Sequence, residues 1–320
     1  MKKILITGCT GVVGYHLTLR LIENRNEIIG IDNNSRGRIN RFSEEDRAKF
    51  DFKEIDIRNY KDLANCIGKN EKVDAVIHLA YVNGTENFYK YPDVVLDVGV
   101  RGLINIFDLC KEKNIKELYI ASSSEVLGNP KIIPSPEESE INISNISNPR
   151  YSYGGGKILY ELFGKHYMPD FFSKLILFRP FNVYGPKMDP GHVIPDLLSK
   201  IKKMKIDKPY LNFEVSGSAD QTRSFEYIDD FVDGFEIVME KGTNREIYNI
   251  GNDEEVSIKL LIEKMFKLIN PKLKINIIDK KDHVGSPTRR CPDISKLKNL
   301  GYKPKINLDK GLRKMITGKF

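Results

Sequence analysis

The sequence predicts an α/β fold, in which a doubly wound parallel sheet is followed by a smaller C-terminal α/β lobe. Short apolar segments alternate with helical patterns from Met1 to about Phe178. Such alternation is typical of a parallel sheet covered by helices on both faces. A glycine-rich turn directly follows the first apolar segment, which suits the start of such a sheet. Beyond Pro180 the pattern loosens into helices with short strands between them, which indicates the second lobe.

Each expected strand is a short apolar run. The runs are residues 1–8, 27–32, 50–57, 73–78, 117–122 and 173–178. Helices are expected at residues 100–113, 153–167, 193–204, 230–241, 255–269 and 308–316. The segment 129–149 is rich in Pro, Ser and Asn, and predicts a loop within the domain because strand and helix signals resume directly after it.

A phosphate-binding turn is predicted at the start of the chain, where three glycines follow the first strand in the spacing Gly-x-x-Gly-x-x-Gly. Glycines permit a tight turn, close approach of the backbone to a pyrophosphate, and close packing of helix on strand. The helix that follows presents unpaired N–H groups and its positive dipole end to the phosphates. We therefore expect a dinucleotide here, bound by Gly8, Thr10, Gly11, Val12, Val13 and Gly14.

An acid at the end of the second strand indicates which dinucleotide binds. Asp32 ends that strand and is followed by Asn33. A carboxylate there accepts hydrogen bonds from the adenosine ribose and repels a 2′-phosphate, so NAD is favoured over NADP. Arg36 and Arg38 follow closely and soften that preference.

The third strand also ends in an acid, Asp56, followed by Ile57. Asp56 could meet the adenine amino group of the dinucleotide. The alternative is an ordinary cap for the helix that begins near Tyr60. Only the other dinucleotide signals favour the first interpretation.

Tyr153 and Lys157 form the candidate catalytic pair. On a helix this spacing places the phenol and the ammonium one turn apart on the same face. A free tyrosine has a pKa near ~10, and a neighbouring ammonium favours its phenolate form. The same spacing occurs on many surface helices, so its weight comes from the dinucleotide turn in the same chain.

Composition agrees with a globular protein. The chain has 320 residues, 40% of them apolar, and no apolar run approaches the length of a membrane span. The net charge of +7 is dispersed among 44 acidic residues, which does not indicate nucleic-acid binding. The cysteines, Cys9, Cys66, Cys110 and Cys291, have no metal-ligand spacing and fit a reduced cytoplasm.

Taken together, the motifs resemble the extended short-chain dehydrogenase/reductase family, in its nucleotide-sugar epimerase, dehydratase and decarboxylase branch. The resemblance covers nearly the whole chain. Besides the features above, it rests on residues 78–80 (HLA), 122–126 (SSSEV), 179–186 (RPFNVYGP), 221–225 (QTRSF) and 289–294 (RRCPDI). It implies a Rossmann-type domain at residues 1–180, with part of 220–250 interleaved, and a substrate-binding lobe at 181–320. It also implies NAD as cofactor, a nucleoside-diphosphate sugar as substrate, no metal, and a homodimer formed through the helices at 100–113 and 153–167.

The resemblance assigns further site residues. Ser123 corresponds to the catalytic hydroxyl that shares the proton of the sugar 4-OH with Tyr153, while Lys157 also binds the nicotinamide ribose. Leu79, Ala80 and Phe181 are expected beside the cofactor. The residues expected at the nucleotide or sugar end of the substrate are Asn182, His192, Arg223 and Arg290.

Glu125 bears on which reaction the chain catalyses. A 4-epimerase needs no second base, whereas a 4,6-dehydratase must also remove the C5 proton, for which Glu125 is the candidate. A uronic acid decarboxylase is less favoured because Ile158 stands where an arginine is usual. We expect an epimerase, because epimerases dominate this branch. The alternatives are the dehydratase and, from a different class, an NAD-binding regulator without chemistry, which would commonly lack the Tyr–Lys pair.

Two departures from the family pattern, at positions 81 and 99, bear on the sugar rather than on the cofactor, and a third, at positions 154–156, matches no subgroup of the family. Tyr81 stands where a small residue is usual, which places an aromatic ring near the expected sugar pocket. Gly99 replaces an asparagine that commonly precedes the helix at 100–113. Three consecutive glycines, 154–156, replace bulkier residues.

Overall fold

The computed structural model describes residues 1–204, 210–280 and 287–318. Its centre is a seven-stranded sheet in the order β11-β6-β5-β4-β1-β2-β3, with every neighbouring pair parallel. The strands are β1 (Lys3–Thr7), β2 (Glu27–Asp32), β3 (Asp51–Glu54), β4 (Ala75–His78), β5 (Glu117–Ala121), β6 (Lys174–Pro180) and β11 (Ile247–Ile250). The predicted Rossmann-type α/β sheet is thus confirmed, with its strand order reversing between β1 and β4.

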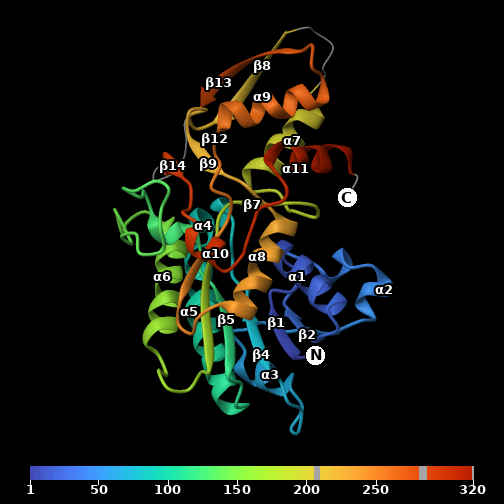
Figure 1. Ribbon diagram of the computed structural model, residues 1–320, viewed down its shortest axis with the longest axis vertical. Helices are drawn as coiled ribbons and strands as arrows, with labels where there is room; N and C mark the ends of the chain where they lie inside the picture. The colour runs from blue at the N-terminus through green and yellow to red at the C-terminus, as the bar shows by residue number, and fades with distance from the viewer. Residues whose placement is uncertain (205–209, 281–286, 319–320) are drawn as a thin grey trace.

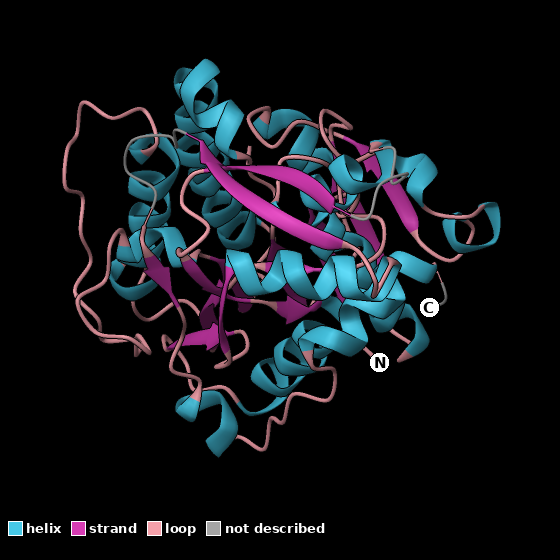
Figure 2. Ribbon diagram, turned by 90° about the horizontal axis from the view of Figure 1, so that it is seen from above, coloured by secondary structure: helices cyan, strands magenta, loops and turns pink. Residues whose placement is uncertain are grey.

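Helices cover both faces of this sheet (Figures 1 and 2). On one face α1 (Val12–Glu23) packs against α8 (Ile228–Lys241). On the other, α5 (Pro92–Glu112) packs between α3 (Tyr60–Asn65) and α6 (Tyr151–His166), with α4 (Thr85–Lys90) alongside. Each face has its own apolar core, so the strands are buried on both sides, as their apolar runs predict. The short helix α2 (Glu44–Arg47) lies between β2 and β3.

Most of the remaining elements build the smaller lobe, at the upper end of Figure 1, whereas α10 (Ser295–Asn299) lies beside β11 of the large sheet. The strands of the lobe form three small sheets, β10 with β7, β12-β9-β14, and β13 with β8. They are β7 (Val183–Tyr184), β8 (Tyr210–Ser216), β9 (Thr222–Ser224), β10 (Glu226–Tyr227), β12 (Glu255–Ser257), β13 (Lys274–Lys280) and β14 (Arg289–Arg290). The helices are α7 (Val193–Lys203), α9 (Ile258–Ile269) and α11 (Leu308–Thr317).

Of the predicted boundaries, three differ most from the structure. The segment expected as one helix from Glu255 begins as strand β12, and α9 starts only at Ile258, where Ser257 caps it by accepting from Leu260 N at 3.0 Å. Strand β3 ends at Glu54, two residues before Asp56. Helix α5 starts at Pro92, a favoured first position, so Gly99 lies inside the helix and not before it.

Two compositional expectations can be compared with the structure. No helix in the described part of the chain is long and apolar enough to span a bilayer. All four cysteines are buried free thiols, and no cluster of potential metal ligands occurs among the described residues.

Glu226 of β10 is a buried carboxyl group whose ionisation affects stability. Tyr302 donates a hydrogen bond to its Oε1, while Oε2 has no partner within the described ranges. Burial raises the pKa of Glu226 to about 8, and the nearby charge of Asp230 adds to the effect. An unfolded glutamate has a pKa near ~4.3. Between these two values the unfolded chain loses this proton while the folded chain keeps it, so stability falls as pH rises through that window.

We expect Glu226→Gln to stabilise the protein at pH 7.5 by about 1–3 kcal/mol, because the amide never ionises. Below about pH 4 the difference in stability between the variant and the wild type should vanish, since Glu226 is then protonated in both the folded and the unfolded wild type. Thermal unfolding from pH 4 to 8 measures this, with Glu263→Gln, at an exposed position on α9, as the control. A pH-independent difference between Glu226→Gln and the wild type would contradict the prediction.

Candidate active site

The candidate site lies at the carboxyl ends of β1, β4 and β5, beside the point where the strand order reverses. Open parallel sheets bind their ligands at this point. The glycine turn leaves β1, residues Leu79–Tyr81 leave β4, and Ser122–Glu125 leave β5. Hydrogen bonds tie the first two together, because Leu79 N donates to Thr7 O at 3.1 Å. Residues expected from three separate motifs are therefore brought to one edge of the sheet.

The glycine turn has the geometry that a dinucleotide phosphate requires. Gly8 has a φ of +73°, and a methyl group added there would lie 2.7 Å from Ala80 N. One added at Gly14 would lie 2.1 Å from Gly8 O, so α1 packs directly on the turn. The helix begins after Gly11 with no side-chain cap from the described residues, which leaves its first N–H groups available to an anion. The expected residues thus fit a pyrophosphate.

Asp32 is oriented by the backbone of the same turn. Its carboxylate accepts from Thr10 N at 3.1 Å and from Asn34 N at 2.9 Å. Burial raises its pKa, although these hydrogen bonds oppose the shift. The loop after β2 rests on the turn, because a methyl group at Gly37 would lie 2.2 Å from Thr10 O. Asp32 therefore lies beside the phosphate turn, where a ribose hydroxyl of the dinucleotide could reach it.

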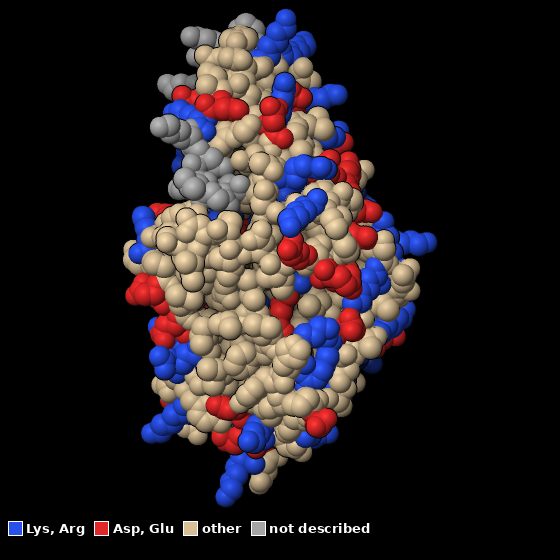
Figure 3. All heavy atoms as spheres, turned by 90° about the vertical axis from the view of Figure 1, so that its left-hand side faces the viewer, with Lys and Arg blue, Asp and Glu red and all other residues tan. Residues whose placement is uncertain are grey.

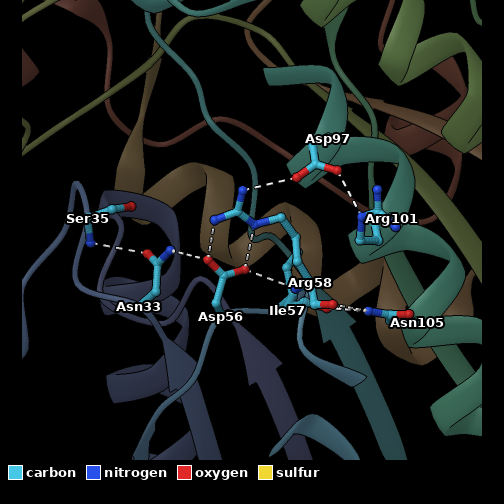
Figure 4. Close-up of polar contacts among 8 residues, drawn as sticks. All are labelled: Asn33, Ser35, Asp56, Ile57, Arg58, Asp97, Arg101 and Asn105. Atoms are coloured by element: carbon cyan, nitrogen blue, oxygen red, sulfur yellow. Dashed lines mark hydrogen bonds and ion pairs between the residues drawn. The ribbon is translucent and has the colours of Figure 1, made fainter. Parts of the chain in front are cut away.

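Asp56 belongs to a network of charges at the end of β3 (Figure 4). Arg58 binds it through two nitrogen atoms, at 3.0 and 2.7 Å, and Asn33 donates to it at 3.1 Å. Hydrogen bonding from Arg58 lowers the pKa of Asp56. The helix-cap interpretation is wrong, since Asn59 caps α3 by accepting from Asp62 N. Asp56 and Asn33 thus lie together, as an adenine site would require.

Tyr153 and Ser123 meet at the start of α6. Tyr153 is 6% exposed, and its ring stacks on Phe88 with centroids 4.7 Å apart. Burial raises the pKa of Tyr153 to about 12, while a hydrogen bond with Ser123 opposes the shift. Ser123 in turn accepts from Glu125 N at 3.2 Å, which fixes its hydroxyl. The phenol and the serine hydroxyl can therefore act on the same substrate oxygen.

Lys157 lies one turn after Tyr153 on the same helix and is buried. Its Nζ donates to Ala121 O at 2.6 Å and lies 5.7 Å from the centroid of the Tyr153 ring. Burial lowers the pKa of Lys157. The expectation that Lys157 lowers the pKa of Tyr153 is not met in this arrangement, because desolvation of the phenol dominates.

A buried ion pair holds α6 in place, and sequence reasoning missed it. Arg179 donates to both carboxylate oxygens of Glu161, at 2.7 and 2.8 Å, and to Glu137 O at 2.8 Å. Ser122 donates to the same carboxylate at 2.5 Å. Helix α6 is thereby tied to β5 and β6. The signal was a glutamate one turn after Lys157 together with an arginine ending a buried strand.

Glu125 is engaged by two arginines. Arg290 Nη1 lies 2.6 Å from its Oε1, and Arg150 donates to both oxygens, at 2.8 and 3.2 Å. Burial alone would raise the pKa of Glu125, but the charges and hydrogen bonds of the two arginines outweigh it and lower the pKa to about 2. Glu125 is therefore a paired carboxylate. Arg150, immediately before α6, was not singled out from the sequence.

Two arginines expected at the diphosphate lie side by side. Arg223 of β9 and Arg290 of β14 are register partners in a parallel pair, and both are buried. The Nε and Nη2 atoms of Arg290 have no hydrogen-bond partner in the described part of the chain. Buried, unsatisfied guanidinium donors are costly unless a ligand anion meets them. The pair therefore fits a phosphate-bearing substrate.

The remaining expected residues are Asn182 and His192, expected at the substrate, and Phe181, expected beside the cofactor. Asn182 has a φ of +41° and donates to Ser224 O at 2.8 Å, while Phe181 is fully buried against Val126 and Leu127. His192 Nε2 lies 2.8 Å from Arg36 Nη2. Burial and the charge of Arg36 lower the pKa of His192 to about 4, so it is neutral.

Tyr81 lies beside the candidate catalytic tyrosine. Its ring lies edge-on to Tyr153, with centroids 5.0 Å apart, but its hydroxyl is directed between α5 and α6. The hydroxyl thus lies in the interface between these two helices.

A dinucleotide turn, an acid at the end of β2 and a Ser–Tyr–Lys group on one edge of a Rossmann sheet define an enzyme that transfers hydride through a nicotinamide cofactor. The match to the NAD dependent epimerase/dehydratase family spans residues 4–251, and the chain belongs to that family.

Individual relatives carry out different reactions. UDP-glucuronic acid decarboxylase 3 of Arabidopsis thaliana is 33% identical, over 97% of this chain and 86% of its own. The dTDP-D-glucose 4,6-dehydratase of Dictyostelium discoideum is 27% identical, over 98% and 80%. Among solved structures, the UDP-glucose 4-epimerase of Thermotoga maritima superposes with a TM-score of 0.85 at 24% identity, covering 98% of this chain and 97% of that one. These comparisons place the chain among the nucleotide-sugar epimerases, dehydratases and decarboxylases.

Proposed function

We propose that the protein is an NAD-dependent epimerase that inverts C4 of a nucleoside-diphosphate sugar through a transient 4-keto sugar. The observation that carries this choice is the state of Glu125. A carboxylate bound by two arginines, with a pKa of about 2, is a weak base, and a dehydratase would need it to take the C5 proton. An epimerase needs no such base.

The residues support the first half-reaction as follows. Arg223 and Arg290 bind the diphosphate, and Ser123 and Tyr153 hydrogen-bond to the sugar 4-OH. Tyr153 takes the 4-OH proton as the C4 hydrogen leaves as hydride. NAD, when bound, supplies the hydride acceptor and later the donor. The ammonium of Lys157, one turn along the same helix, favours the phenolate that forms in that step.

Inversion requires the keto sugar to turn over between the two hydride transfers. Tyr153 then returns its proton to the oxygen at C4 after hydride reaches the opposite face. The Glu125–Arg150 pair contributes no proton to this cycle. Its role here is to fix Arg290, and with it the diphosphate, while the sugar rotates.

A second candidate is a decarboxylase, which acts on a nucleotide sugar that carries a carboxylate, or a dehydratase, which removes water from the sugar. The similarity to a UDP-glucuronic acid decarboxylase favours the decarboxylase, as do Arg150 and Arg290, which could meet a substrate carboxylate in place of Glu125. Ile158 opposes it, since no arginine follows Lys157.

Incubation of the purified protein with a panel of nucleotide sugars, followed by product mass and by NMR that resolves the configuration at C4, tests the proposal. We expect a product of unchanged mass with inverted C4. Loss of water would identify a dehydratase, and loss of carbon dioxide a decarboxylase.

The Tyr153→Phe variant, which removes one hydroxyl, should keep NAD binding while turnover falls by a factor of at least about 10². A variant that keeps wild-type turnover would show that another group is the base.

The Glu125→Gln variant separates the reactions further. In an epimerase no obligatory proton transfer is lost, so epimer formation should stay within about tenfold of the wild type. In a dehydratase the reaction should stop after the first hydride transfer, seen as reduced cofactor absorbing near ~340 nm. Because the amide leaves Arg150 and Arg290 without their carboxylate, thermal unfolding should be measured in parallel. The exposed Glu138→Gln serves as the control.

We also propose that two copies associate through α5 and α6. Apolar side chains on these helices are exposed, Leu96 by 43%, Ile104 by 39% and Leu162 by 51%. Figure 3 shows a broad area without charged side chains on the side where α6 lies in Figure 1. Sedimentation should give twice the mass of one chain, and Leu162→Glu should yield the single-chain mass, whereas Leu260→Glu, at an exposed site on α9, should not. A wild type that sediments as a single chain would refute this.

A further inference from the structure

Tyr81, three residues after the end of β4, is held by close packing against two glycines. Its hydroxyl is buried and has no hydrogen-bond partner among residues 1–204, 210–280 and 287–318. A methyl group added at Gly156 of α6 would lie 2.0 Å from the hydroxyl oxygen, and one added at Gly99 of α5 would lie 2.2 Å from it. The tyrosine fits between the helices only because both positions lack a side chain.

Tyr81 also forms one wall of the space around the Lys157 ammonium. Lys157 Nζ lies 4.2 Å from the centroid of the Tyr81 ring and 4.1 Å from that of Tyr160. Ala121 O accepts one of its hydrogen bonds. A buried cation without an anionic partner is stabilised by the faces of aromatic rings. The two tyrosines therefore help to keep Lys157 charged and in place.

The two walls are fixed in different ways. Tyr160 is anchored by hydrogen bonding, because its hydroxyl lies 3.0 Å from His78 Nε2, and His78 Nδ1 lies 2.8 Å from Thr7 Oγ1. The position of Tyr81 depends instead on the space left at Gly99 and Gly156. A shift of Tyr81 would therefore move one wall of the Lys157 site and the ring packed edge-on to Tyr153.

We propose that Tyr81 is a positioning residue for hydride transfer: seated against Gly99 and Gly156, it holds the Lys157 ammonium and the Tyr153 ring in their reactive arrangement. The inference rests on the proposed function only for the action of Tyr153 and Lys157 on a sugar hydroxyl, a step that epimerase, dehydratase and decarboxylase share. It also explains why α6 carries glycine at position 156, where a glycine weakens the helix.

A steric rescue experiment tests whether the position of Tyr81 depends on the space left at Gly99 and Gly156. Gly156→Ala should lower kcat and NAD affinity on the order of 10- to 100-fold, because the displaced hydroxyl moves the groups that contact the cofactor and substrate. Gly155→Ala is the matched control on the same helix turn, since its methyl group would meet only Ile143 Cδ1, at 3.6 Å. That control should keep wild-type kcat and NAD affinity, with Tm unchanged or slightly higher.

Tyr81→Phe should rescue Gly156→Ala, because beyond the hydroxyl the nearest atom to the added methyl is Tyr81 Cζ at 3.2 Å. It should not rescue Gly99→Ala, whose methyl group would still meet ring carbons at 2.5 and 2.7 Å. NAD affinity and Tm compare these single and double variants without any substrate. The comparison therefore holds even if the sugar reaction proves to be a different one. If the double variant Tyr81→Phe/Gly156→Ala has NAD affinity as low as that of Gly156→Ala alone, the proposed packing of Tyr81 against Gly156 is wrong.

The pH profile of turnover tests the positioning role itself. Tyr81→Leu keeps an apolar side chain but removes the ring face, so the Lys157 ammonium should lose its proton at lower pH. The alkaline limb of kcat should then shift down by about 0.5–1 pH unit, while Tyr81→Phe keeps the wild-type profile. An unchanged profile and kcat in Tyr81→Leu would overturn the proposal, because a merely structural tyrosine would affect Tm alone. A wild type without activity on any nucleotide sugar would refute the proposed function. The NAD affinities of the Tyr81 and glycine variants would still show whether Tyr81 packs as proposed.

Discussion

The buried ion pair between Arg179 and Glu161 is the constraint on which the geometry of the candidate site depends. It joins the end of β6 to the middle of α6, and Ser122 at the end of β5 shares the same carboxylate. Removing one partner of such a pair leaves an uncompensated buried charge, which costs several kcal/mol, so the helix cannot slide along the sheet without a large penalty. Lys157 and Tyr153 lie one and two turns before Glu161 on this helix. Their distances from the strand ends are thus set by a contact that touches neither substrate nor cofactor.

In the candidate site, positive and negative charges have different surroundings. Lys157 is buried with a carbonyl and two aromatic rings around it, whereas the nearby carboxylate, Glu125, is bound by two arginines. The arrangement keeps positive charge close to the reacting oxygen, where a developing phenolate benefits from it, and withholds a second base. The proposed epimerase reaction, a reversible oxidation of a hydroxyl without elimination, is consistent with this distribution of charge.

The sequence predicted the parts of the fold and site that depend on local pattern. The glycine turn, Asp32 and the Tyr153–Lys157 helix follow from periodicity and spacing, and they lie at the expected edge of the sheet. The pairing of Glu125 could not be foreseen, because Arg150 and Arg290 come from distant segments and only the folded chain brings them to one carboxylate. The start of α9 was misplaced for a related reason: residues 255–257 pair with β9, a tertiary contact that overrides helical pattern.

The glycines at 99 and 156 show how this chain reconciles helix stability with the needs of its site. Each glycine inside a helix costs about 1 kcal/mol relative to alanine, so local propensity alone opposes both. Yet an alanine at either position would collide with the hydroxyl of Tyr81. That tyrosine supplies an aromatic face to Lys157, which its burial otherwise drives toward the neutral form. The departures at positions 81, 99 and 156 therefore form one coupled feature, in which two helices give up local stability so that a buried ammonium is kept charged beside Tyr153.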